Sequence, residues 1–435
     1  MKMDILKQLQ QRTDQFEVVH VRNESTQVRF ESNRLKTSQV EETKGIAVRV
    51  VKQGRLGFAA SSDASATDQL VKNAIESAMY GDQVPITFPA AQSAPTVKTF
   101  DPMITDLPIP RLVEIGKEIV DYILQIEPEA RVDVSLKRGI QQVALHNQTG
   151  NEAAYHSSPL SISVLVNKIQ GDDVLLISDF TGTTVWQEDY MAGTRRLGEK
   201  LKLARRLVAA TSGNLPVLFA PDGLLMLGLP LQQGLNGKSV FTGISPMKGK
   251  LGEKLFSDKL TVIDDGTIDG KFGSAPYDDE GVPHRRTALI ERGVLKNFIY
   301  DLKTAAQSGV ASTGNGSRTL FAPPNPAPTN FIVGAGDTPL ADILAGIDTG
   351  LLVEDVLGLG QGNIISGAFS NPLSLAFKIE KGEIVGRVKN ASLAGNIYDL
   401  LKNIAAISRE TEWVYSNLNL PYLLLPEMNV VAKAG

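Results

Sequence analysis

The stretch LSLAFKIEKGEIVGRV, residues 373–388, contains two apolar-rich runs that meet at Lys381-Gly382. Two such runs joined by a short glycine-containing connection are the sequence signal of an antiparallel hairpin. Short strand-like runs, separated by loops rich in Gly and Pro, recur from residue 213 to the end of the chain. We therefore predict that residues 213–435 form an antiparallel β domain, strongly curved or barrel-like, with a few helices.

Two segments upstream of this domain mix helices and strands. Residues 1–80 begin with an amphipathic helix, continue with the strand-like runs FEVVHVR, STQVRFES, GIAVRVV and LGFAASS, and end in a helix at residues 67–80. Residues 111–212 have a similar order and end in a helix at residues 192–210. The predicted class is α+β, and the similar order suggests that both segments belong to one domain. Residues 81–110 lack periodicity, which predicts a linker.

The composition is that of an ordinary globular protein, with 42% hydrophobic and 21% charged residues in a chain of 435. The formal net charge is −4, whereas nucleic-acid binding depends on Lys and Arg that neutralise phosphates. The densest basic stretch, residues 195–206, is interleaved with Glu199 and with Leu and Ala at helical spacing, which favours a solvated helix face. We therefore expect no nucleic-acid partner.

Redox and targeting features indicate a cytoplasmic protein. The chain contains no cysteine, which excludes disulfides and thiolate metal ligands and fits a reducing compartment. Near the N-terminus, Asp4 and Lys7 occupy positions where an export signal needs an apolar core. The most apolar stretch, residues 215–231, is interrupted by prolines and an aspartate, so we expect no membrane span and no membrane partner.

The four histidines do not form a metal-binding pattern. None of them lies three or four residues from another, and no H-E-x-x-H or H-x-H motif occurs. His20, His146 and His156 lie in strand-like runs, where a structural role is favoured. His284 follows DDEGVP in a loop, where a surface position is favoured over a catalytic one. Ser317, in TGNGSR, lacks the G-x-S-x-G context of a serine nucleophile.

Two carboxylate clusters stand out, Asp264-Asp265 and Asp278-Asp279-Glu280. Paired carboxylates can perform acid–base chemistry or bind hard cations. Both clusters lie beside glycines, and Asp-Gly sequences are typical of turns. A turn is therefore the favoured interpretation, and the binding of a cation at either cluster stays open. These residue patterns alone identify no active site.

Five strings in the last segment nevertheless form a recognisable series. They are DDGT from Asp264, DDEGVPHRRTALIERGVLKNFIYD from Asp278, GVASTGNGSR from Gly309, GLLVEDVLGLGQGNIISGAFS from Gly350, and the ending LPYLLLPEMNVVAKAG. Their order and spacing resemble the C-terminal half of the TldD/PmbA family, and the last two resemble its PmbA branch, also called TldE. The resemblance is sharp over residues 216–435 and weaker upstream, where the order of elements agrees.

The resemblance also shows what this chain lacks. TldD-type members of the family are zinc peptidases with an H-E-x-x-x-H helix and a cysteine ligand. By the family spacing, the two histidines of this motif fall near Asp222 and Leu227, and its glutamate falls near Gly223. None of these residues is a histidine or a catalytic glutamate. No histidine occurs between residues 157 and 283, and there is no cysteine. We therefore expect no catalytic residue and no zinc site in this chain.

The resemblance implies a role beside a catalytic subunit. Members of the PmbA branch are paired with TldD-type subunits, and the family acts on peptide precursors and unfolded polypeptide. We expect a dimer, with a TldD-like subunit or with a second copy, in which zinc is bound only by the TldD-like partner. Gly314, Asn315 and Gly316 are candidates for a peptide groove, because glycine permits close backbone approach. A simple tight turn explains them equally well.

Two other functions stay open. One is a stand-alone homodimeric peptide-binding protein without a proteolytic role. The other is a hydrolase that uses the carboxylates around Asp264 and Asp278.

Overall fold

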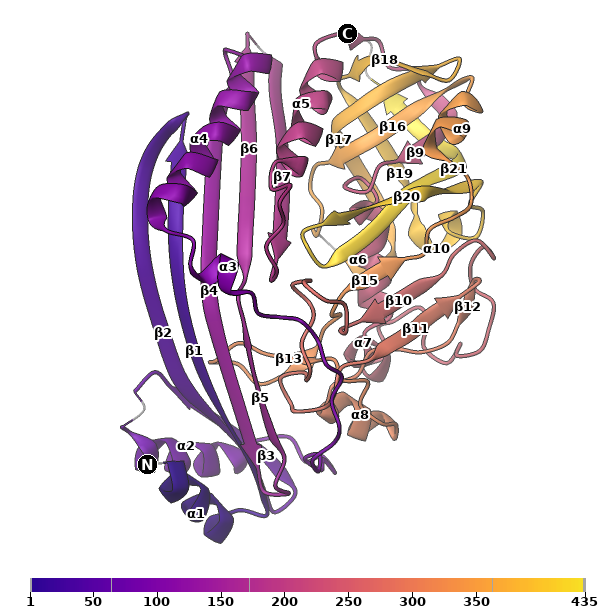
Figure 1. Ribbon diagram of the computed structural model, residues 1–435. Helices are drawn as coiled ribbons and strands as arrows, with labels where there is room; N and C mark the ends of the chain where they lie inside the picture. The colour runs from indigo at the N-terminus through magenta and orange to yellow at the C-terminus, as the bar shows by residue number, and fades with distance from the viewer. Residues whose placement is uncertain (1, 64, 172, 362, 433–435) are drawn as a thin grey trace.

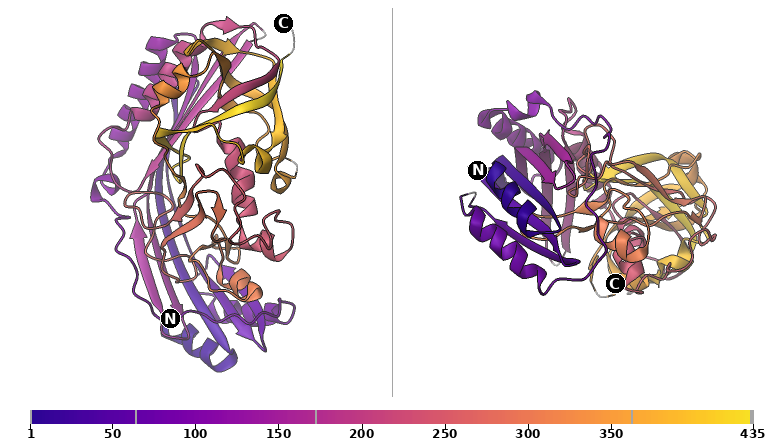
Figure 2. Two further views of the ribbon diagram at one scale, coloured as in Figure 1. Left: turned by 90° about the vertical axis from the view of Figure 1, so that its right-hand side faces the viewer. Right: turned by 90° about the horizontal axis from the view of Figure 1, so that it is seen from below.

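The computed structural model describes residues 2–63, 65–171, 173–361 and 363–432. Two sheets dominate (Figure 1): a long curved sheet from the N-terminal half, and a mixed, mostly antiparallel sheet from the C-terminal half. Seen from below, the two halves lie side by side (Figure 2). The predicted α+β class, with a barrel-like C-terminal domain, is confirmed.

The first sheet has seven strands, all paired antiparallel, in the order β3-β2-β1-β4-β6-β7 with β5 beside β4. The strands are β1 (Gln15–Glu31), β2 (Arg34–Lys52), β3 (Arg55–Ser61), β4 (Arg131–Asn147), β5 (Glu152–Ser157), β6 (Leu160–Gln170) and β7 (Asp173–Thr183). The runs FEVVHVR and STQVRFES, predicted as separate strands, form the single strand β1. The polar residues Asn23 and Glu24 between them stay in the strand because they pair with both β2 and β4.

Part of β2 is a free edge of this sheet. Residues 46–52 pair with β3 in a hairpin. Residues 34–45 pair with β1 and, among the residues that the structure describes, with no other strand. The side chains of residues 34–44 are exposed throughout. An unpaired edge of this kind can accept a strand from another chain.

Helices cover the sheet at both ends (Figure 1). At one end lie α1 (Lys2–Arg12) and α2 (Thr67–Ala78), and at the other α4 (Ile109–Ile126) and α5 (Ala192–Ala204). Helix α5 ends earlier than predicted, because the chain after it forms β8 (Leu207–Val208), which pairs with the C-terminal sheet.

Residues 81–110 run along the junction between the first sheet and the loops of the C-terminal half, where Lys98 forms hydrogen bonds with residues 269 and 270 (Figure 1). They contain the short helix α3 (Pro102–Thr105), and α4 begins at Ile109. Val84, Ile86 and Phe88 are buried and pack together with Val51. This segment is thus irregular in secondary structure but fixed by apolar contacts.

The C-terminal sheet closes into a barrel. Its ring runs through β9 (Gly213–Phe219), β16 (Thr349–Val356), β17 (Ala368–Glu380), β19 (Ala391–Asn396) and β21 (Leu418–Ala432), and β21 pairs with β9 to close it. The ring is mostly antiparallel, and β9 and β16 run parallel. Closure of this kind leaves no free edge within the ring.

The hairpin predicted at residues 373–388 has the predicted turn. β17 pairs with β18 (Glu383–Val388) across Lys381 and Gly382, whose φ angles are 51° and 81°. Positive φ at both central residues matches the twist of the flanking strands, and glycine adopts it readily.

The remaining elements lie around the barrel and below it. They are α6 (Leu225–Gly234), α7 (Gly237–Phe241), β10 (Val262–Asp265), β11 (Arg286–Glu291), β12 (Val294–Leu295), α8 (Leu302–Ser308), β13 (Gly316–Ser317), β14 (Asn325–Pro326), β15 (Phe331–Val333), α9 (Leu340–Ala345), η1 (Ile364–Ser366), α10 (Ile397–Leu400) and β20 (Ala406–Val414). None of the described helices is long and apolar enough to cross a membrane.

Candidate functional site

A cavity of about 590 Å³ lies between the first sheet and loops of the C-terminal half. One wall comes from β4, β5 and β7, through residues such as Gln141, Tyr155 and Phe180. The other wall includes Asp278-Asp279 and the TGNGSR loop, which are far from the sheet in sequence. The structure therefore brings one carboxylate cluster and the candidate groove residues to one place. A cavity of this size can hold part of a bound ligand.

The carboxylate of Asp264 fixes the TGNGSR loop at Asn315. Oδ2 of Asp264 accepts hydrogen bonds from Nδ2 of Asn315 at 2.6 Å and from Oγ1 of Thr329 at 2.9 Å, and Oδ1 accepts from the Thr329 N–H at 2.7 Å. Burial raises the pKa of Asp264 to about 6, although these hydrogen bonds oppose the shift. Oδ2 thus holds the loop at Asn315, and both oxygens hold Thr329.

Asp278 and Asp279 hold the same loop through two backbone N–H groups, those of Gly316 and Arg318. Oδ1 of Asp278 accepts from the Glu280 N–H, and its Oδ2 accepts from the Gly316 N–H, each at 2.9 Å. Oδ2 of Asp279 accepts from the Arg318 N–H at 2.9 Å. Burial, and then the charge of Glu280, raise the pKa of Asp278 well above its usual range, and burial raises the pKa of Asp279. The turn interpretation thus describes how these carboxylates are used.

The candidate groove residues Gly314, Asn315 and Gly316 are all buried. Gly314 has a φ of +74°, and a Cβ on it would lie 2.7 Å from the Pro283 carbonyl oxygen. A Cβ on Gly316 would lie 2.4 Å from Oε2 of Glu280. Valine at either glycine would therefore disturb the loop, because the loop needs both glycines for its own packing. The groove itself stays a prediction, with Asn315 and Gly316 on the cavity wall.

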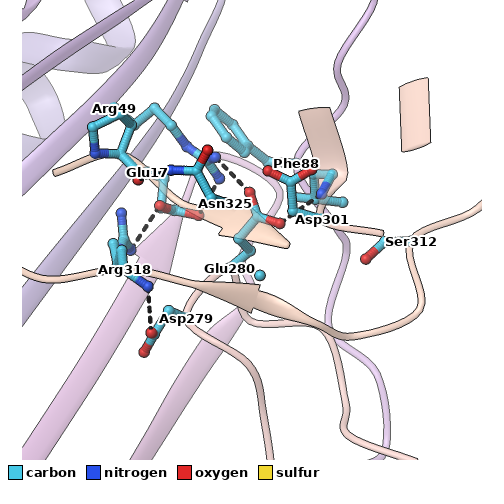
Figure 3. Close-up of polar contacts among 12 residues, drawn as sticks. Glu17, Arg49, Phe88, Asp279, Glu280, Asp301, Ser312, Arg318 and Asn325 are labelled. Atoms are coloured by element: carbon cyan, nitrogen blue, oxygen red, sulfur yellow. Dashed lines mark hydrogen bonds and ion pairs between the residues drawn. The ribbon is translucent and has the colours of Figure 1, made fainter. Parts of the chain in front are cut away.

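A buried ionic network joins the first sheet to these loops (Figure 3). The Arg49 guanidinium contacts Oε2 of Glu17 at 3.1 Å and Oε1 of Glu280 at 2.5 Å. The Arg318 guanidinium contacts Oε1 of Glu17 at 2.9 Å. The four side chains are between 0% and 4% exposed. Buried charges persist only when paired, so the two halves of the chain depend on each other here.

The burial of this network also explains why the pKa of Glu280 is raised. Burial raises the pKa of Glu280 to about 7, because the attraction of Arg49 only partly opposes the loss of water. Oε2 of Glu280 additionally accepts the N–H of Leu302 at 2.6 Å, at the start of α8.

The segment that the resemblance aligns with the zinc helix lies elsewhere, at a second cavity of about 150 Å³. Oδ2 of Asp222 and Oε2 of Glu354 accept hydrogen bonds from Nζ of Lys200 at 2.7 and 2.8 Å. Burial lowers the pKa of Lys200, but the two carboxylates outweigh it and raise that pKa, so the side chain is an ammonium. Sequence reasoning missed Lys200 and Glu354, although a charged residue inside the apolar run GLLVEDVLG is a usable signal.

The residues of this segment do not fit a zinc ion. A Cβ on Gly223 would lie 2.2 Å from the Val353 carbonyl oxygen, so no glutamate side chain can stand there without movement of the backbone. Leu227 is 1% exposed, in the apolar core. Asp222 is the one side-chain donor of the three, and Lys200 already binds it. Throughout the described part of the chain, no group of three or more His, Cys, Asp or Glu could hold a metal ion.

The histidines occupy both expected and unexpected places. His20, His146 and His156 lie in β1, β4 and β5, as predicted. His284, predicted at the surface, is 9% exposed and lines the larger cavity. It is buried because its ring packs against the backbone of Gly266. Ser317 lines the same cavity, but the structure places no hydrogen bond between these two described residues.

The burial of His284 predicts a specific dependence on pH. Burial lowers the pKa of His284 to about 4, below its usual 6.5. The unfolded chain therefore binds a proton between pH 6.5 and 4 that the folded chain does not bind, so folding loses stability as the pH falls through this window. Relative to His284→Gln, the wild type should lose about 3 kcal/mol between pH 7 and 4. Urea unfolding of both proteins checks this, and parallel pH profiles would contradict it.

Comparison with known sequences bears on both halves of the chain. Residues 212–432 match the family described as the PmbA/TldA metallopeptidase C-terminal domain, and residues 16–78 match PmbA/TldA metallopeptidase domain 1. Uncharacterized protein MJ0231 of Methanocaldococcus jannaschii is 27% identical over 89% of this chain and 89% of its own length. The metalloprotease TldD homolog of Haemophilus influenzae is 37% identical over 47% of this chain and 43% of its own length.

Comparison with solved structures supports the fold. The crystal structure of TldE from Thermococcus kodakarensis superimposes with a TM-score of 0.89 at 22% identity, over 99% of this chain and 100% of that one. The family match covers half of the chain, and the resemblance of the five C-terminal strings is confirmed. The chain therefore belongs to the PmbA/TldD metallopeptidase family.

Proposed function

We propose that this chain is a metal-free, non-catalytic subunit of a PmbA/TldD-type peptidase, which holds polypeptide and pairs with a zinc-bearing TldD-like subunit or with a second copy. The observation that carries the proposal is the chemistry at residues 222–227. There the ammonium of Lys200 binds the carboxylate of Asp222, and the side chains of Gly223 and Leu227 contain no atom that could bind a metal ion.

The free edge of β2 supports a role in holding polypeptide. Residues 34–45 leave one row of backbone groups without a strand partner in the described structure. An extended peptide, or an edge strand of another subunit, can add to such an edge through backbone hydrogen bonds that read little sequence. The cavity beside the TGNGSR loop offers a place for a side chain of a bound polypeptide.

The proposal is tested by zinc content and activity in the presence and absence of a partner. The chain is purified alone and together with a TldD-like protein from the same genome, and zinc per chain is measured beside cleavage of an unfolded polypeptide. For the isolated chain, we expect far less than one zinc ion per chain and no cleavage. For the co-purified complex, we expect both bound zinc and cleavage. A stoichiometric zinc in the isolated chain, with chelator-sensitive cleavage, would contradict the proposal.

The same experiment separates the alternative function. If no TldD-like protein co-purifies, and the isolated chain still binds unfolded polypeptide as a homodimer, the stand-alone binding protein is the better description. Cleavage by the isolated chain in excess chelator would instead revive a carboxylate-based hydrolase.

A further inference from the structure

The larger cavity has an unusual balance of charge. Its lining includes two carboxylates, Asp278 and Asp279, and neither lysine nor arginine. Five aromatic side chains line it as well: Tyr155, Phe180, Phe272, Tyr277 and Tyr415. Lys271 precedes the lining residue Phe272 in sequence, but it lines a different cavity. Its Nζ lies 4.2 Å from the ring centroid of Trp413.

The cations behind the cavity are already engaged. Arg49 is bound by Glu17 and Glu280, and Arg318 is bound by Glu17. Charge at Asp278 and Asp279 is therefore only partly compensated, which is consistent with the raised pKa of both groups.

The two carboxylates differ in what they have left to offer. Asp278 is buried, and its two oxygens accept backbone N–H groups, including that of Gly316. Asp279 is partly exposed in the cavity wall, and its Oδ2 accepts the Arg318 N–H. Oδ1 of Asp279 has no hydrogen-bond donor among the described residues. Asp279 is thus the carboxylate that can bind a ligand.

Two polar groups in the wall of the same cavity also lack a partner within the part of the chain that the structure describes. The hydroxyl of Tyr155, largely buried in the cavity wall, has no hydrogen-bond partner among the described residues. Nδ1 of His284 is buried without a partner in the described structure. Buried polar groups without partners are rare in folded proteins, and each calls for an explanation. A bound ligand that donates hydrogen bonds is one.

We propose that this cavity receives the positively charged side chain of a lysine or arginine in a bound polypeptide, with Asp279 as its counter-ion and Tyr155 as a second hydrogen-bond partner. A carboxylate beside aromatic rings is suited to ammonium and guanidinium groups, through a charge-assisted hydrogen bond and through contact with the rings. A divalent metal ion fits less well, because it requires more oxygen ligands than the one free oxygen of Asp279 provides.

The aromatic wall is itself built as a unit. The ring centroids of Phe180 and Tyr415 lie 6.3 Å apart with the rings near parallel, and those of Phe180 and Phe272 lie 6.4 Å apart edge to face. This cluster joins β7 to the loops around residues 272 and 415, so the wall does not depend on one loop alone. The inference rests on the proposed polypeptide-holding function and adds its side-chain preference.

The test compares peptides that differ in one side chain. Fluorescently labelled peptides of equal length carry lysine, arginine, norleucine, citrulline or glutamate at one central position, and binding to the full chain is measured by anisotropy at about pH 8, where carboxylates are ionised. We expect lysine and arginine peptides to bind about tenfold more tightly than the norleucine and citrulline peptides.

Variants assign the preference to the cavity. Asp279→Asn keeps an oxygen for the Arg318 N–H, and it should reduce the lysine-over-norleucine preference to less than about twofold without weakening the norleucine peptide. Tyr155→Phe should reduce the preference severalfold. Asp342→Asn, an exposed carboxylate on α9, is the matched control and should leave it unchanged. Thermal melts confirm that each variant is folded.

The outcomes separate the two proposals. Equal affinity for lysine and norleucine peptides, or a full preference in both Asp279→Asn and Tyr155→Phe, overturns the inference and leaves the polypeptide-holding function standing. If neither the isolated chain nor its complex with a TldD-like protein binds any of the peptides, both proposals are overturned.

Discussion

Replacing Arg49 by methionine should destabilise the protein by about 3–5 kcal/mol. Methionine keeps much of the side-chain volume but removes the guanidinium that pairs Glu17 with Glu280. Both glutamates are 0% exposed, and a buried charge that loses its partner costs far more than the pair contributed. Chemical denaturation followed by fluorescence measures the change in the free energy of unfolding.

An exposed arginine serves as the matched control for this prediction. Arg22 pairs with Glu42 at 3.0 Å, on the same two strands, with side chains 55% and 47% exposed. Arg22→Met should change stability by less than about 1 kcal/mol, because surface ion pairs contribute little. If the two variants behave alike, the network in Figure 3 does not hold the halves together as described.

Replacing Gly223 by alanine should cost about 2–3 kcal/mol or more. The added Cβ would lie 2.2 Å from the Val353 carbonyl oxygen on β16, so the turn before α6 must move away from the barrel. The cost falls on a backbone contact rather than on a flexible side chain, and the neighbour cannot rotate out of the way. The free energy of unfolding again provides the measurement.

Gly228, within α6, provides a direct comparison. A Cβ on Gly228 meets nothing within 4 Å, and alanine restricts the unfolded chain more than glycine does. Gly228→Ala should therefore be neutral or stabilising by up to about 1 kcal/mol. A Gly223→Ala protein as stable as Gly228→Ala would show that position 223 can accept a side chain, and would weaken the argument against a catalytic glutamate there.

Local patterns in the sequence predicted much of the fold. Lys381-Gly382 identified its hairpin because a tight turn is decided by the two residues that form it. The helix predicted at residues 67–80 matches α2 (Thr67–Ala78) at its start and within two residues at its end. Local patterns failed where pairing decides, as at Asn23 and Glu24, which look like a break but lie inside β1 because strands flank them on both sides.

The site was less predictable because its parts are distant in sequence. Arg49 and Glu280 are 231 residues apart, and no spacing rule connects them. The same holds for His284, whose loop sequence predicted exposure although the fold buries it against Gly266. Asp264 and Asp278 were both interpreted as turn residues, but Asp264 lies in β10. The loop that they fix, at Asn315 and Gly316, could not be inferred from them.

The barrel ring has a consequence for how the protein is made. β21 pairs with β9, β15, β19 and β20, so the ring cannot close while that strand is still inside the ribosome. The first sheet, complete by β7, can assemble much earlier during synthesis. Until β21 emerges, the nascent C-terminal half exposes unpaired strand edges that can associate with other chains. Protection by chaperones matters most in this interval.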